Sequence, residues 1–297
     1  MNACINQSYD DLLPGDSKVP STHPVVDLPY LRVLTISSGV GALTAVLRHI
    51  TFPSSAAFRL TCREIQSIQI DLSNFLSVLT TTFLSALVIR SLRLEFSDDE
   101  TGLGFFLWTA IIQDCLPSTI AQSQLQLFLI WPSSQPHSYV KALTCAFDAM
   151  RWSFLSRLQM STLDHIDSRT WVKTFGKLPL LEWVWVLRSA PSFLEALVYK
   201  TESDERSERA YHDVSFPKLR DIHLVGTNFK FIANSPTISV DTLLDHLMGR
   251  CERNAEVQVL RLEDCYYISS NEVERLREVG DVIWDGVEQE YYSDLDG

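Results

Sequence analysis

The sequence predicts an α/β solenoid, a horseshoe in which a curved parallel sheet carries helices on its outer face. Three observations lead to this fold class. One strand pattern returns along the chain, with apolar residues separated by two spacers and then by one, as in residues 31–36 and 89–94. Stretches with the apolar spacing of a helix separate most of these strands. The centres of successive strands lie roughly 20–40 residues apart, which is the length of a strand, a helix and their connections.

The pattern begins at Leu28, after polar residues that contain Pro14-Gly15 and Pro24 and show no period. We therefore expect residues 1–27 to be a flexible leader, residues 28–286 to be the solenoid and residues 287–297 to be an acidic tail. The predicted strands are residues 31–36, 58–62, 89–96, 125–131, 155–160, 180–186, 219–225, 257–262 and 282–284.

The predicted helices lie between these strands, and several have a recognisable start. Capping residues precede three helices, and a proline lies in the first turn of another. The caps are Asp167 or Ser168, Ser239 or Asp241, and Ser269 or Ser270, and the proline is Pro191. The predicted helices are residues 40–49, 64–87, 139–150, 167–176, 191–198, 239–253 and 269–279.

Residues 97–123 fit the repeat least well. Leu103, Phe106 and Trp108 copy the strand pattern, but they follow Leu92 too closely for a full repeat. An extra edge strand and the start of a helix running to Ile112 both fit this stretch, and both stay open.

A doubly wound sheet is the competing fold. It predicts strands buried on both faces and a glycine-rich first turn. Most strands here carry polar spacers and the chain has no such turn, so the solenoid is favoured.

The charge of the chain limits its partners. The 37 acidic and 25 basic residues give a net charge of -12, which disfavours nucleic acid and anionic membrane surfaces. The six cysteines form no CxxC pair and are expected to be reduced thiols of the core. No signal peptide and no apolar stretch long enough to span a bilayer is recognised, so we expect a cytoplasmic or nuclear protein.

Sequence motifs of catalysis are missing. The chain has no GxSxG elbow, no phosphate-binding glycine loop and no HExxH pair, and its seven histidines are dispersed. We therefore expect no enzyme, no cofactor and no metal site, and we expect the chain to bind another protein.

The spacer residues of the strands are the candidate binding residues, because in a solenoid they point to the concave face. Residues 125–131 are ambiguous, since either Leu127, Leu129 and Trp131 or Phe128 and Ile130 can point outward. Either alternative puts apolar side chains outward and would give an apolar binding patch that Val184 and Val186 extend; a covering helix or loop from residues 97–123 is the other explanation. The candidates are Arg93, Glu95, Leu127, Leu129, Trp131, Arg157, Gln159, Val184, His223, Arg261 and Glu263.

Three motifs suggest a family. They are the strand opening Pro217-Lys-Leu219-Arg-Asp-Ile222, the run Val259-Leu-Arg-Leu-Glu-Asp-Cys265 and the closing Trp284-Asp-Gly286. The strands with their helices resemble leucine-rich repeats, and the C-terminal end resembles that of mushroom-type fungal F-box/leucine-rich-repeat proteins.

This resemblance covers roughly residues 28–286 and implies the substrate-recognition part of an F-box-like ubiquitin-ligase receptor. The F-box, a helical segment that binds a Skp-type adaptor, is not recognised before Leu28. A Skp-type adaptor is therefore expected as a partner only if an F-box exists outside this chain. The alternative is a free-standing repeat scaffold or inhibitor protein without a link to a ligase.

Overall fold

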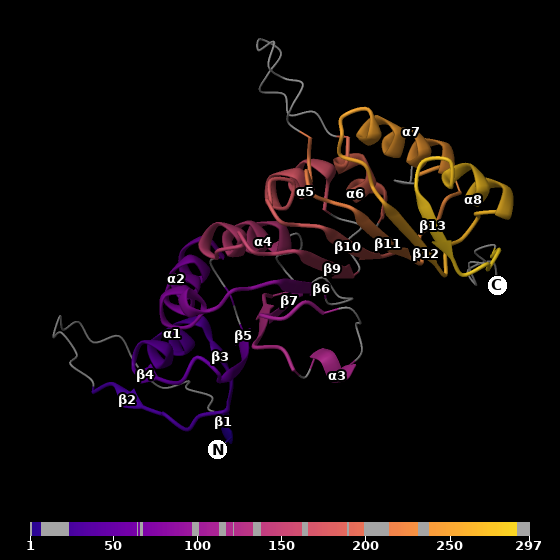
Figure 1. Ribbon diagram of the computed structural model, residues 1–297. Coiled ribbons are helices and arrows are strands. Elements are labelled where there is room, and N and C mark those ends of the chain that lie inside the picture. Colours follow the sequence, from indigo (N-terminus) through magenta and orange to yellow (C-terminus); the bar gives the residue numbers. More distant parts are fainter. Residues whose placement is uncertain are drawn as a thin grey trace, which may run out of the picture. The chain divides into compact units, whose positions relative to one another are not determined.

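The computed structural model divides into two units, Met1–Trp152 (unit 1) and Ser153–Gly297 (unit 2), each with its own strands and helices (Figure 1). It describes residues 2–6, 24–63, 65, 68–96, 101–112, 117–120, 122–132, 138–161, 166–188, 190–198, 214–230 and 238–289.

Unit 1 contains a main sheet, a small two-stranded sheet and helices. Its strands are β1 (Asn2–Asn6), β2 (Val26–Asp27), β3 (Val33–Gly39), β4 (Ile50–Thr51), β5 (Ala57–Arg63), β6 (Ser91–Phe96), β7 (Gly102–Trp108) and β8 (Leu125–Ile130). Its helices are α1 (Val40–Arg48), α2 (Ser73–Thr82), α3 (Pro117–Ile120) and α4 (Ser138–Ala149), with short helical turns at Ile68–Leu72 and Leu84–Ala86.

The main sheet of unit 1 contradicts the predicted horseshoe. Its strand order is β1-β3-β5-β8-β7-β6, so β8 and not β6 lies next to β5. Strand β7 is antiparallel to both β6 and β8, whereas β8 runs parallel to β5. The fold is therefore a mixed α/β sheet, and the predicted all-parallel solenoid is wrong.

The short connection after β6 explains the antiparallel pairing. Only five residues separate Phe96 from Gly102, and a parallel crossover needs about a dozen or more. Residues 102–108 therefore turn back as a hairpin strand. This strand lies inside the sheet and is neither the edge strand nor the helix that the sequence leaves open.

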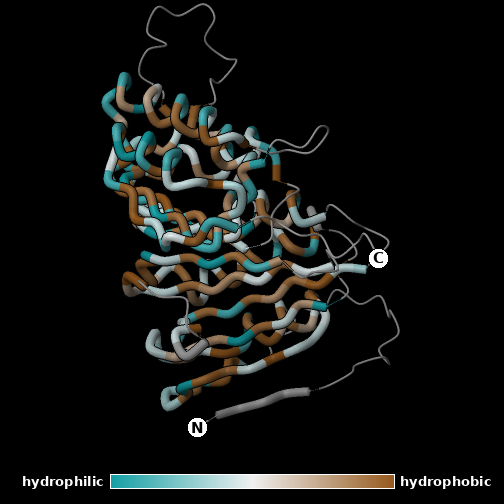
Figure 2. The backbone as a smooth tube through the Cα atoms, turned by 90° about the vertical axis from the view of Figure 1, so that its right-hand side faces the viewer, coloured by the Kyte–Doolittle hydropathy of each residue, from teal (hydrophilic) through white to brown (hydrophobic). Residues whose placement is uncertain are grey.

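Helices α1, α2 and α4 lie on one face of this sheet, and α3 lies on the other (Figure 1). The side chains that point to the larger helical layer are apolar and buried, among them Leu34, Phe58, Leu92 and Phe105. Phe58 packs against Phe52 and Phe83, with ring centroids 4.5 and 4.3 Å apart. Hydrophobic and hydrophilic residues alternate along several strands (Figure 2).

Unit 2 alternates strands and helices, and its strands are all parallel and follow the order of the sequence. The strands are β9 (Arg157–Ser161), β10 (Trp183–Leu187), β11 (Asp221–Val225), β12 (Val259–Glu263) and β13 (Asp281–Trp284). The helices are α5 (Ser168–Thr174), α6 (Ala190–Ala196), α7 (Val240–Cys251) and α8 (Ser270–Leu276). These helices lie on one face of the sheet (Figure 1).

Side-chain caps begin three of these helices. Asp167 accepts a hydrogen bond from the Thr170 amide at the start of α5, and Ser239 accepts one from the Thr242 amide at the start of α7. Ser269 forms a capping box with Glu272 at the start of α8. Of the two cap residues that the sequence allows for each helix, the first is the observed one. These bonds satisfy amides that the first helical turn leaves unpaired.

Part of the predicted leader forms strands. Asn2–Asn6 of the expected leader forms β1, which pairs in parallel with β3, and Val26–Asp27 forms β2. Residues 7–23 and 290–297 lie outside the described residues, and with them most of the predicted leader and tail.

Candidate functional site

The sheet of unit 2 has one face that the helices leave uncovered, which we call the open face. In the described part of unit 2, α5–α8 all lie on the opposite side (Figure 1). The strand register aligns Gln159, Trp185, His223, Arg261 and Ile283 in one row across the five strands. The neighbouring rows of the open face contain Arg157, Trp183, Asp221, Val259 and Asp281 on one side, and Ser161, Leu187, Val225 and Glu263 on the other.

Two ion pairs join β11 and β12 on the open face. The Nε of Arg261 lies 3.5 Å from Oδ1 of Asp221. The Nε2 of His223 lies 3.0 Å from Oε2 of Glu263, whose side chain is 55% exposed. Because each pair joins neighbouring strands, the pairs hold the four side chains across the sheet.

Aromatic contacts join β9, β10 and β11. The guanidinium of Arg157 lies over the ring of Trp183, 5.1 Å from its centroid. The ring of Trp185 meets His223 edge-on, with centroids 6.2 Å apart. A cation over an indole and an edge-to-face ring pair are both attractive arrangements, so the planar groups of the open face lie in fixed positions.

His223 is a titratable group of this face whose pKa is shifted. Burial lowers the pKa of His223, and the carboxylate of Glu263 opposes this shift. The side chain of His223 is 18% exposed, so it is more shielded from water than that of Glu263.

Six predicted binding residues belong to unit 2, and five of them lie on the open face. Arg157, Gln159, His223, Arg261 and Glu263 point there, although Gln159 is only 4% exposed. Val184 is the exception, and the expectation that it points outward is wrong. Val184 and Val186 are fully buried on the helical side.

The reason for the exception lies in the sequence of β10. Both sides of this strand are apolar, so alternation alone cannot tell which side faces the helices. Pairing with β9 and β11 settles the orientation and places Trp183 and Trp185 on the open face. Trp183 is nevertheless buried, at 6% exposed, as the sequence predicts, and Trp185 is the partly exposed candidate that the sequence analysis missed.

In unit 1 the prediction that Leu127, Leu129 and Trp131 point outward is also wrong. Leu127 and Leu129 are fully buried and Trp131 is 2% exposed, so these three side chains belong to the core. The other register is the observed one, since Phe128 is half-buried and Ile130 is 37% exposed. The polar residue Gln126 indicates this register in the sequence, because it shares a face with Phe128 and Ile130.

Arg93 and Glu95 lie on the same face of unit 1 as Phe128, and they form an ion pair along β6. This face is partly covered by the chain around α3. The Nε1 of Trp108 donates to the carbonyl of Thr119 (3.1 Å), and the Nε2 of Gln126 donates to that of Ile120 (2.9 Å). Residues 119–120 therefore cover part of this face, as the sequence analysis allowed for a helix or loop from residues 97–123.

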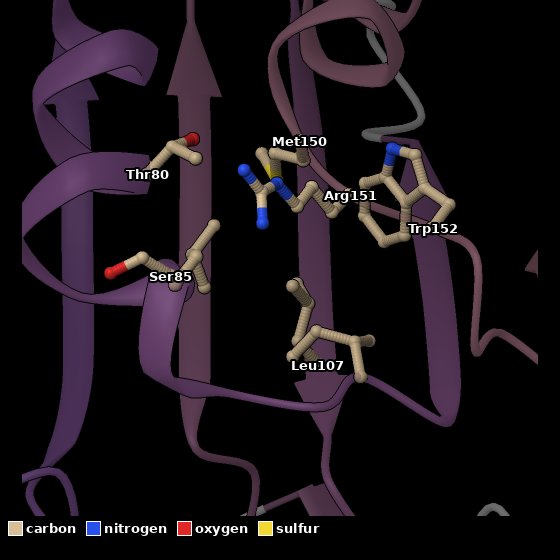
Figure 3. A pocket seen from close by; sticks show the side chains of 8 residues that line it. Thr80, Ser85, Leu107, Met150, Arg151 and Trp152 are labelled. Carbon is tan, nitrogen blue, oxygen red and sulfur yellow. The ribbon is translucent and has the colours of Figure 1, made fainter.

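A small hollow in unit 1 is lined by Thr80, Ser85, Leu107, Met150 and Trp152, with Arg151 reaching across it (Figure 3). It has room for about one water molecule. It is therefore too small to bind a metabolite or a cofactor.

The four cysteines whose side chains the structure describes differ in burial. Burial raises the pKa of Cys265 to about 11 and raises the pKa of Cys62 further, and a buried, protonated thiol is unreactive. Cys145 is half-buried and Cys251 is exposed, so the predicted core position holds for Cys62 and Cys265. Among the described residues no cluster of side chains could hold a metal ion.

Comparison of the chain with protein-family models, with curated proteins and with solved structures finds no match. In the part of the chain that the structure describes, no helix is long and apolar enough to span a bilayer.

Proposed function

We propose that unit 2 is a protein-binding module and that a partner protein packs on its open face. The observation that carries this proposal is the single helical layer. Parallel sheets are almost always covered on both faces, and the described helices of unit 2 cover only one (Figure 1). Gln159, Ser161, Trp183 and Val225 of this face are already buried within the chain, so a partner would cover the exposed part of the face, which includes Ile283.

The side chains of the open face support this proposal. Tryptophan and arginine contribute most often to the binding energy of protein interfaces, and Trp185 and Arg261 lie in the same row of this face. Ile283 adds an apolar side chain that is 45% exposed. The contacts of Trp185 with His223 and of Arg261 with Asp221 reduce the ordering that binding requires.

A matched pair of substitutions tests the proposal. Ile283→Asp places a carboxylate on the open face, and Met248→Asp places one on α7, where the native side chain is 47% exposed. Crosslinked partners from a cell lysate are quantified for the wild type and for both variants. We expect Ile283→Asp to reduce capture of the specific partner at least about tenfold, which corresponds to about 1.4 kcal/mol, while Met248→Asp leaves it unchanged.

Thermal unfolding of both variants serves as the control for folding. Equal melting temperatures with equal capture by the two variants would contradict the proposal. Loss of capture with Met248→Asp alone would place the binding surface on the helices instead.

The link to a ubiquitin ligase rests on the family resemblance of the sequence motifs. The proposed cytoplasmic or nuclear location rests on the other sequence features given above and not on that resemblance. Capture of a Skp-type adaptor by the purified chain, without any added F-box, would support this role. Capture of a partner without an adaptor would support the alternative of a free-standing scaffold or inhibitor.

A further inference from the structure

Arg250 is a fully buried cation in unit 2. It lies near the end of α7 and has no exposed surface. Its hydrogen-bond partners among the described residues are three main-chain carbonyls and no carboxylate. Nη1 donates to Leu197 (3.3 Å) and to Ser215 (2.7 Å), and Nη2 donates to Phe216 (2.9 Å).

These three carbonyls belong to two chain segments that the structure describes on either side of residues 199–213. Leu197 directly follows α6, and Ser215 and Phe216 lead into β11. The carbonyl oxygens of Leu197 and Ser215 bind the same nitrogen atom, so they are close neighbours. The two described segments therefore meet at one place in unit 2.

Both segments are anchored at that place. Phe216 is fully buried, and its amide donates to the carbonyl of Gly176 (2.7 Å). Phe216 also packs edge-on against Phe193 of α6, with ring centroids 5.8 Å apart. The guanidinium thus lies where the end of α6, the start of β11 and α7 meet.

The chemistry of arginine suits this position. A guanidinium has five donors in a planar fork, so it can bind several carbonyls at once. A positive charge near the last carbonyls of a helix is also favourable, because they carry a partial negative charge. Burial lowers the pKa of Arg250 to about 10, so the side chain keeps its charge at neutral pH.

We propose that Arg250 is a clasp that holds the end of α6 to the start of β11, so that the fold of unit 2 does not depend on the chain that connects them. Tolerance of a change in a connection follows from the burial and bonding of the backbone at its ends. Here the described ends are held by a side chain of α7.

Replacement of residues 200–212 by a Gly-Ser linker of about six residues tests whether the fold of unit 2 depends on the connecting chain. Such a linker spans up to about 20 Å, which is ample for neighbouring ends. We expect a melting temperature within about 2 °C of the wild type. A fall of more than about 5 °C would overturn the proposal, because it would show that the connecting chain stabilises unit 2.

Cleavage of the connection tests the role of Arg250 itself. A recognition site for a specific protease replaces residues 203–208, and the cut protein is analysed by size exclusion and circular dichroism. We expect the cut chain with Arg250 to remain one folded species, and the cut Arg250→Met variant to separate or unfold. Dissociation of the cut chain with Arg250, or persistence of the cut Arg250→Met variant, would overturn the proposal.

Arg253→Met is the matched control, since this arginine lies three residues further along and is exposed. It should leave the cut protein intact. If Arg250→Met does not fold even before cleavage, Arg250→Lys takes its place, because lysine keeps the charge but not the planar fork. The linker experiment retains Arg250. Its result therefore shows whether the fold depends on the connecting chain, whether or not Arg250→Met folds.

Discussion

Leu127 and Phe128 are neighbours in β8, yet one is fully buried and the other lies half-buried on the opposite face of the sheet. The strand contains apolar residues on both sides, so hydrophobicity alone does not assign its faces. Gln126 assigns the faces of β8, because a polar residue indicates the more exposed side of a strand. The same ambiguity in β10 has no such marker, and Trp183 and Trp185 could not be placed from the sequence.

The buried position of Leu127 and Leu129 leads to a prediction. The double substitution Leu127→Asp and Leu129→Asp should abolish cooperative unfolding of unit 1, measured by circular dichroism on heating. Loss of each buried leucine costs about 2–5 kcal/mol, and a buried carboxylate adds to this. The sum is comparable with the whole stability of a typical domain, about 5–15 kcal/mol.

Ile130→Asp is the control for this prediction, because Ile130 lies in the same strand and is 37% exposed. It should shift the melting temperature only slightly. A cooperative transition in the double variant would show that Leu127 and Leu129 are not core residues.

At the scale of elements, the sequence predicts helix starts better than strand neighbours. Asp167, Ser239 and Ser269 cap their helices through residues three positions away, so the signal is local. The partner of a strand is set by distant residues. Strand β5 pairs with β8 although β6 and β7 lie between them in the sequence, and the short connection before β7 was the available indication of a reversal.

Gly104 of β7 lies close to the rings of Phe106 and Phe128. A Cβ at this position would lie 3.1 Å from Phe128 and 3.3 Å from Phe106. Gly104→Ala should therefore press on both rings and lower the stability of unit 1 by about 1–3 kcal/mol. The midpoint of urea unfolding measures this change.

Gly39→Ala is the matched control, since a Cβ at Gly39 meets nothing within 4 Å. Gly39 is the N-cap residue of α1, where alanine is less favourable than glycine, so this substitution should lower the stability by no more than about 1 kcal/mol. An equal effect of the two substitutions would mean that the rings of Phe106 and Phe128 can move aside without loss of packing.

At the scale of the whole molecule, the repeated strand–helix pattern describes unit 2 but not unit 1. In unit 2 each strand pairs with the next strand of the sequence, as a regular repeat requires. In unit 1 the hairpin of β6 and β7 breaks that order. The solenoid prediction failed because it extended one local pattern over residues 97–123, where the spacing already departs from it.

The net charge of -12 is a property of the whole chain and predicts a dependence on salt. Mutual repulsion of excess charges destabilises a folded protein, and salt screens it. The Debye length falls from about 30 Å at 0.01 M salt to about 8 Å at 0.15 M. Salt also weakens exposed ion pairs such as Arg275–Asp241, but each of these contributes at most about 1 kcal/mol.

Repulsion should therefore dominate, and the melting temperature at pH 7 should rise by a few degrees between these two sodium chloride concentrations. Differential scanning calorimetry measures the shift. The control is the same experiment near pH 5.0, the isoelectric point, where repulsion between excess charges vanishes and salt weakens only the attractive pairs. There the melting temperature should stay constant or fall. A fall with salt at pH 7 would show instead that ion pairs outweigh the excess negative charge in this fold.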